Sequence, residues 1–139
     1  MADLINQVKL GCAKGTAVEE AVNHNFSGET QEVGLYLAMS RQAQREGYPE
    51  IAATLELIAL DEAWHAAHFA ELNGKISAST KENLQKMLAG EQGANKGKRK
   101  AALKAKEEGC DPGHDFFNES SRDEGRHAQS LEGLLKRYF

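Results

Sequence analysis

The stretch Asp61-Glu62-Ala63-Trp64-His65-Ala66 recurs 62 residues later as Asp123-Glu124-Gly125-Arg126-His127-Ala128. The same offset carries Gly28-Glu29 onto Gly90-Glu91 and Glu46-Gly47 onto Glu108-Gly109. We interpret this shared register as an internal duplication, in which each half carries one early Glu and one later Glu-x-x-His motif. Two such halves provide the ligands of a carboxylate-bridged two-metal centre inside a four-helix bundle.

Helix start and stop signals divide the chain into four helices. The first is expected from Thr16, which forms a capping-box pair with Glu19, to about Glu46. The others are expected over residues 49–72, from 79 or 80 to about 108, and from 112 to about 138, with Asp111 as the N-cap of the last. No alternating apolar pattern indicates a strand, so the predicted fold is an all-α four-helix bundle.

The predicted domain organisation is simple. A chain of 139 residues normally forms one domain. We expect an N-terminal appendage over residues 1–15 and a single domain over 16–139, made of helical hairpins at about 16–73 and 79–139.

Composition excludes several classes of function. Hydrophobic residues make up 40% and charged residues 27% of a chain whose net charge is -4, which argues against a nucleic-acid partner. The sequence contains no run of about 18 apolar residues, so we expect no membrane span. The two cysteines, Cys12 and Cys110, form no Cys-x-x-Cys motif, so we expect a reducing cytoplasm and two small buried residues.

The Glu-x-x-His motifs lie on apolar helix faces. Glu62 and His65 project from the same side of a helix as Ile58 and Phe69. The second motif is flanked in the same way by Phe117 and Leu131. One such motif alone is usually a solvated helix face, but ionised carboxylates on a core-facing stripe are costly unless paired or metal-bound. Two copies of the motif in the same register therefore favour the interpretation that these Glu and His residues bind metal.

The expected ligands are Glu29, Glu62, His65, Glu91, Glu124 and His127.

The two halves differ next to the early Glu. Glu32, one turn after Glu29, has Ala94 as its counterpart, so the first half alone offers a seventh possible ligand. The alternative for Glu32 is a position outside the ligand shell or in solvent. Tyr36 has Lys98 as its counterpart; we assign Tyr36 either to a hydrogen bond with a ligand or the substrate, or to a buried structural role.

The stretches GETQEVGLY (28–36), EGYPEIAATLELIALDEAWHAAHF (46–69), GEQGAN (90–95) and DEGRHA (123–128) resemble the rubrerythrin family, from about Thr16 to the end of the chain. This is a family of non-haem di-iron peroxidases with a ferritin-like fold. The resemblance implies that two iron ions, bound by the six ligands above, reduce hydrogen peroxide to water. Because these ligand types also accept manganese or zinc, the loaded metal stays open.

The resemblance also implies a seventh carboxylate that exchanges with a His as iron changes oxidation state. That carboxylate usually lies in the second half, whereas here Glu32 lies in the first, so the expected exchange is between Glu32 and His127. The family's usual Cys-ligated, rubredoxin-like domain is not found in this sequence. We therefore expect a separate electron donor, such as a rubredoxin-like protein.

Three rival functions stay open at this point. The same centre could serve a ferroxidase that handles iron with dioxygen, or a manganese centre that dismutates peroxide. A metal-free helical interaction module is the third, although the repeat argues against it.

The length of the connection between the two hairpins predicts how chains assemble. In a ferritin-like bundle the second and third helices run parallel, so the link between them must span roughly 33 Å. Seven virtual bonds from Asn73 to Thr80 reach at most about 25 Å. Either the third helix starts several residues later, or two chains exchange hairpins in a domain-swapped homodimer, which we favour.

Overall fold

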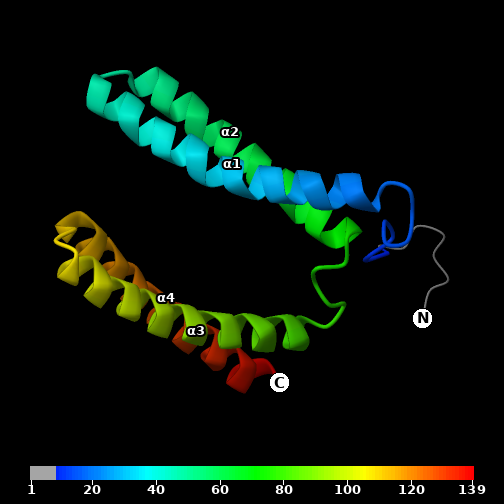
Figure 1. Cartoon of the computed structure of the whole chain (residues 1–139). Helices are drawn as coiled ribbons and strands as arrows, with labels where there is room; N and C mark the ends of the chain where they lie inside the picture. The colour runs from blue at the N-terminus through cyan, green and yellow to red at the C-terminus, as the bar shows by residue number, and fades with distance from the viewer. Residues whose placement is uncertain (1–8) are drawn as a thin grey trace. The chain divides into compact units, whose positions relative to one another are not determined.

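The computed structural model describes residues 9–139 and consists of four helices (Figure 1). They are α1 (Glu19–Glu46), α2 (Pro49–Leu72), α3 (Thr80–Glu107) and α4 (Asp111–Tyr138). The described residues contain no strand, so the all-α prediction is confirmed and agrees with a ferritin-like four-helix bundle.

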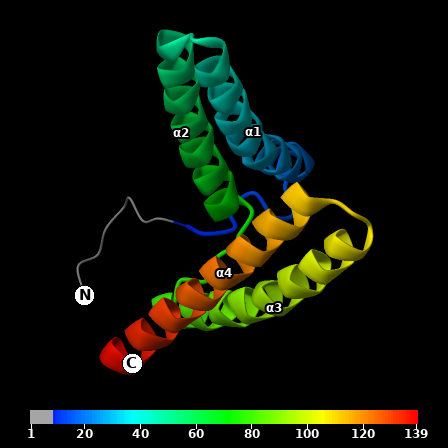
Figure 2. The ribbon, with the colours of Figure 1, turned by 90° about the vertical axis from the view of Figure 1, so that its left-hand side faces the viewer.

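The helices pack in consecutive pairs. α1 packs along α2 and α3 along α4, giving two antiparallel hairpins that we call hairpin 1 and hairpin 2 (Figure 2). The boundary between the two compact units falls between Ala78 and Ser79. The expected appendage over residues 1–15 and single domain over 16–139 stay predictions.

Matching turns close the two hairpins. Gly47 has a φ of 83° and Gly109 a φ of 70°, the left-handed conformation that glycine adopts at helix ends without steric cost. The next residue in each turn, Tyr48 or Cys110, donates its backbone N–H to a carbonyl 2.9 Å away in the last helical turn. The predicted helix ends are thereby confirmed.

Two predicted helix starts are wrong, by three residues in α1 and by one residue in α4. Helix α1 begins at Glu19 rather than Thr16, because Glu19 Oε2 accepts a hydrogen bond from the Gly15 N–H (2.7 Å) and the chain makes further turns first. Helix α4 begins at Asp111 with Cys110 as the N-cap, so Asp111 lies in the first turn instead of capping it. In contrast, α3 begins at Thr80, within the predicted start, and the Ser79 side chain caps it by accepting a hydrogen bond from the Glu82 N–H.

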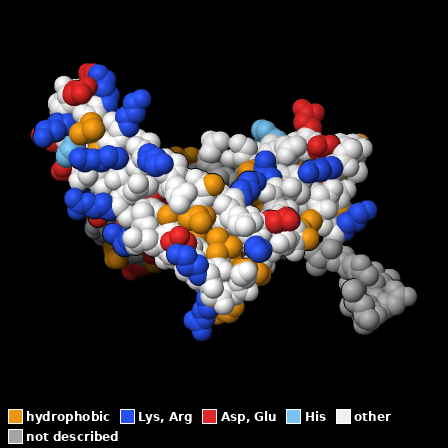
Figure 3. Space-filling model, turned by 90° about the horizontal axis from the view of Figure 1, so that it is seen from below, with side chains coloured by type: hydrophobic (Ala, Val, Ile, Leu, Met, Phe, Trp, Pro, Cys, Tyr) orange, Lys and Arg blue, Asp and Glu red, His pale blue; other side chains and the backbone are white. Residues whose placement is uncertain are grey.

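Each hairpin buries a narrow seam of small residues. Ser40 and Ala59 in hairpin 1 are 1% and 2% exposed, and Ala102 in hairpin 2 is fully buried. Large apolar side chains on the faces that carry the Glu residues stay at the surface, including Ile51 in hairpin 1 and Met87 in hairpin 2, each 52% exposed; Figure 3 shows apolar side chains on one face of the molecule. Because an apolar helix face must be covered by another layer, neither hairpin provides a core by itself.

Part of the predicted N-terminal appendage is held in place. The backbone N–H groups of Gly11 and Ala13 donate to carbonyls at the end of α2, at 2.8 and 3.0 Å, and the Ala13 side chain is buried. Residues 1–8 lie outside the described residues. The expected burial of Cys12 and Cys110 is wrong, because both are exposed.

None of the helices in the described part of the chain is long and apolar enough to span a membrane.

Candidate metal centre

Hairpin 1 brings three predicted ligands together, a group that we call half-site 1. Glu29 comes from α1, and Glu62 and His65 come from successive turns of α2. His65 Nδ1 lies 2.9 Å from Glu62 Oε2 and 3.5 Å from Glu29 Oε2. The two carboxylates are about four-fifths buried, whereas the imidazole is 58% exposed.

Hairpin 2 repeats this arrangement, and we call its group half-site 2. Glu91 comes from α3, and Glu124 and His127 come from α4. His127 Nδ1 lies 3.2 Å from Glu124 Oε2 and 3.6 Å from Glu91 Oε2, and the exposures of the three side chains closely match those of half-site 1. The duplication read from the sequence is therefore also a duplication of geometry.

In each half-site, one donor atom from every residue lies within 4.8 Å of the others. Two carboxylates and one imidazole form a donor set suited to divalent iron, manganese or zinc. All six predicted ligands thus occur in two equal groups of three.

The charges of half-site 1 are compensated only in part. Oε2 of Glu29 is buried and makes no hydrogen bond within the described residues. The pKa of Glu29 is raised, first because its protonated form can share a hydrogen bond with Glu62, and then because burial penalises its charge. A buried oxygen lacking a donor fits a bound cation, which would replace the shared proton.

The same pairing lowers the pKa of Glu62, through hydrogen bonds with Glu29 and then His65. The pKa of His65 is raised, first by its hydrogen bond to Glu62, although burial acts in the opposite direction.

Half-site 2 contains an additional cation. The Lys98 ammonium forms an ion pair with Oε1 of Glu124. The pKa of Glu124 is lowered to about 2, first by its hydrogen bond with Glu91 and next by that with Lys98. The pKa of Glu91 is raised for the same reason as that of Glu29.

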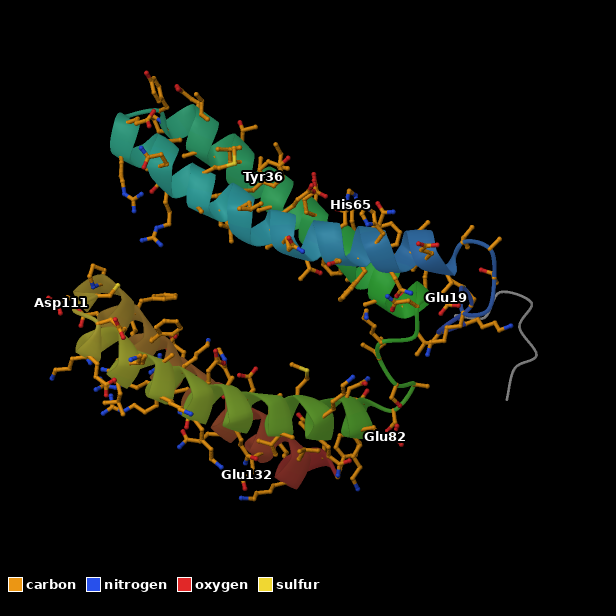
Figure 4. All side chains as sticks on the ribbon, viewed as in Figure 1. Glu19, Tyr36, His65, Glu82, Asp111 and Glu132 are labelled. Atoms are coloured by element: carbon orange, nitrogen blue, oxygen red, sulfur yellow. The ribbon has the colours of Figure 1, made fainter. Side chains whose placement is uncertain are left out.

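The two predicted catalytic residues lie outside these groups. Glu32 is exposed and is not one of the three residues of half-site 1. Tyr36 is half-buried and, among the residues that the structure describes, makes no side-chain hydrogen bond to a ligand; Figure 4 labels it on α1, with His65 on α2. Their proposed roles therefore stay predictions.

Lys98 is the residue that sequence reasoning missed. The sequence did point to this position, because Lys98 is the repeat counterpart of Tyr36 and lies seven residues after Glu91, on the same face of the predicted helix. A long side chain can reach a carboxylate on the neighbouring helix, which the spacing within one helix does not reveal.

Comparisons with known proteins agree with this geometry. A family model described as Rubrerythrin matches residues 20–135. An uncharacterized protein of Methanocaldococcus jannaschii is 64% identical over 137 residues, covering 99% of this chain and 97% of that protein. A protein named Reverse rubrerythrin-1, from Clostridium acetobutylicum, is 50% identical over 134 residues, covering 94% of this chain and 74% of that protein.

Proposed function

We propose, because the chain belongs to the rubrerythrin family, that it is a di-iron peroxidase that reduces hydrogen peroxide to water. The observation that carries the proposal is the pair of matching Glu, Glu and His groups, one in each hairpin. A helical interaction module would have no need to gather four largely buried carboxylates into two such groups.

In the proposed centre, one half-site 1 and one half-site 2 together hold two iron ions. Glu29, Glu62 and His65 of one hairpin, and Glu91, Glu124 and His127 of the other, would be the residues that hold these ions. Iron bound there would supply the two electrons that reduce one peroxide to two waters, a reaction that also consumes two protons.

The carboxylate pairs supply the negative charge that the bound iron ions would require. In each hairpin the neighbouring carboxylate, Glu62 or Glu124, raises the pKa of the early Glu, Glu29 or Glu91. A bound divalent metal would favour the ionised form of both carboxylates.

The proposed assembly is a domain-swapped homodimer. Helix α2 ends at Leu72 and α3 begins at Thr80, so the alternative of a later start for the third helix is excluded. The link stays at seven virtual bonds, about 25 Å at most, against the roughly 33 Å required within one bundle. Pairing hairpin 1 of one chain with hairpin 2 of a second chain removes this conflict.

The proposed reductant is an external electron-donor protein. A Cys-ligated iron site of the rubredoxin type needs four thiolates, whereas Cys12 and Cys110 lie singly in different hairpins, so neither hairpin can form such a site.

An anaerobic experiment tests the proposed activity. Protein loaded with Fe(II) is mixed with peroxide or with dioxygen at equal concentration, and the rates of iron oxidation are compared. We expect oxidation by peroxide to be at least about tenfold faster. Faster oxidation by dioxygen would instead identify a ferroxidase, and a Glu62→Ala variant provides the control for iron bound elsewhere.

Glu32 is proposed as the carboxylate that exchanges with His127 when iron changes oxidation state. The repeat places Ala94 at the counterpart position, so only hairpin 1 offers this group. Glu32→Gln should keep the metal content and lower peroxide turnover about tenfold, a size typical of losing a group that orients ligands. Crystal structures of the oxidised and reduced protein should differ at His127; a displacement at His65 would refute the assignment.

A further inference from the structure

We propose that Lys98 is a positioning residue that makes half-site 2 the weaker of the two metal-binding groups, so that the centre fills in a fixed order, half-site 1 first. This inference rests on the proposed two-metal centre. It concerns a residue that the ligand motif does not contain.

The contacts of Glu124 carry the inference. Its Oε1 is paired with the Lys98 ammonium, while its Oε2 lies 3.2 Å from His127 Nδ1. The two oxygens of this one carboxylate therefore face different partners. The Glu124 side chain is 13% exposed and that of Lys98 is 35% exposed, so solvent screens the pair only in part.

Half-site 1 lacks such a cation. Glu62 occupies the same repeat position as Glu124, and its Oε2 lies 2.9 Å from His65 Nδ1. Within residues 9–139, no lysine or arginine forms an ion pair with Glu62. The position equivalent to Lys98 holds Tyr36, which carries no charge.

Two physical effects follow from this difference. With every Glu ionised and the His neutral, half-site 1 carries two negative charges, whereas half-site 2 with Lys98 carries one. An ammonium in contact with a ligand carboxylate repels an arriving divalent cation and must yield Oε1 of Glu124 before that oxygen could bind a metal. The repulsion between this positive charge and a divalent ion a few ångströms away should lower metal affinity by at least about tenfold.

Lys98 also holds Glu124 while no metal is bound. The ion pair spans α3 and α4 and fixes the carboxylate with Oε2 directed at His127. Lys98 therefore holds half-site 2 in a geometry suited to binding metal, while it lowers the affinity of that half-site for metal.

The test is a titration of the full-length, metal-free protein with Co²⁺, followed by cobalt absorbance and calorimetry. We expect two binding steps that differ by at least about tenfold. His65→Gln should remove the tighter step and His127→Gln the weaker one, which assigns each step to its half-site. Circular dichroism before each titration verifies that the variant is folded.

Lys98→Met should tighten the weaker step about tenfold or more, and Lys98→Arg, which keeps the charge, should preserve the difference. The reciprocal Tyr36→Lys should weaken the tighter step. Lys96→Met, an exposed charge on the same helix, is the matched control and should change neither step by more than about twofold.

The outcomes separate the two proposals. If the wild-type protein binds two Co²⁺ ions and Lys98→Met changes neither step beyond twofold, or weakens binding, the role of Lys98 is refuted and the two-metal centre stands. If the wild-type protein binds no Co²⁺ at all, the two-metal centre itself is refuted, and the role of Lys98 with it.

Discussion

The two hairpins share their ligand faces but differ on the opposite side. A groove in hairpin 1 is lined mainly by apolar residues, among them Val33, Leu37 and Leu60. A groove in hairpin 2 is lined at the equivalent repeat positions by Asn95, Arg99 and Arg122. The same backbone thus carries an apolar groove in one half and a polar, basic groove in the other.

The position of these residues explains why they can differ. Leu60 and Trp64 are each two residues from Glu62, about 160° around the helix from it. Their counterparts in hairpin 2 are Arg122 and Arg126. Metal binding constrains the helix face that carries Glu and His, and the seam requires small residues. Neither constrains the side that carries Leu60 and Trp64, which we call the outer face. Four predictions test this division, from the largest expected effect to the smallest.

The largest effect should come from Glu62 and Glu124, the Glu residues of the two Glu-x-x-His motifs. Glu62→Ala and Glu124→Ala should each lower peroxide turnover by at least about 100-fold and reduce the bound iron, because a lost ligand costs more than a lost outer partner. Steady-state peroxide consumption and metal analysis measure both effects. Retention of activity by one of the two variants would show that the half-sites are not equivalent in function.

Removing the metal should lower the melting temperature of the protein by about 10 °C. A metal at 100 times its dissociation constant stabilises the folded state by about 2.7 kcal/mol, which corresponds to that shift for a chain of this size. Calorimetry with and without a chelator provides the measurement. An unchanged melting temperature in wild-type protein would mean that the carboxylates do not hold a cation.

A smaller effect is expected in α3, where Gly90, Gly93 and Gly97 lie inside a continuous helix. A Cβ added at Gly93 meets nothing within 4 Å, so Gly93→Ala should stabilise the protein by about 1 kcal/mol through helix propensity. The counterpart in α1, Gln31→Ala, should be nearly neutral and is the matched control. A lower melting temperature for Gly93→Ala would indicate instead that another backbone approaches this glycine in the assembled protein.

The smallest effect is expected on the outer face of hairpin 1. The double substitution Leu60→Arg and Trp64→Arg copies hairpin 2 and should change the free energy of unfolding by no more than about 0.5 kcal/mol. Co²⁺ affinity should stay within twofold of wild type. A large loss of metal binding would show that this face supports the centre after all.

The sequence predicted the helices and the pairing of Glu with His within one helix because both depend on local spacing. Glu62 and His65 must share a helix face when they are three residues apart, and the offset of 62 residues transfers the same geometry to Glu124 and His127. The start of α1 was missed because Thr16 and Glu19 match a capping box, whereas Glu19 bonds to Gly15.

Other features depended on contacts that spacing does not encode. The ion pair of Lys98 with Glu124 joins residues 26 positions apart on different helices. The exposure of Cys12 and Cys110 depends on how the turns that contain them pack, and a small apolar residue type gives no guide to that.

The narrow seam of Ala and Ser has a kinetic consequence. A helix pair with so little buried volume gains little free energy until a second pair covers its apolar surface. In the proposed swapped dimer that second pair belongs to another molecule, so completing the native state requires two chains to collide. Refolding should then be second order, with a half-time that shortens as the protein concentration rises.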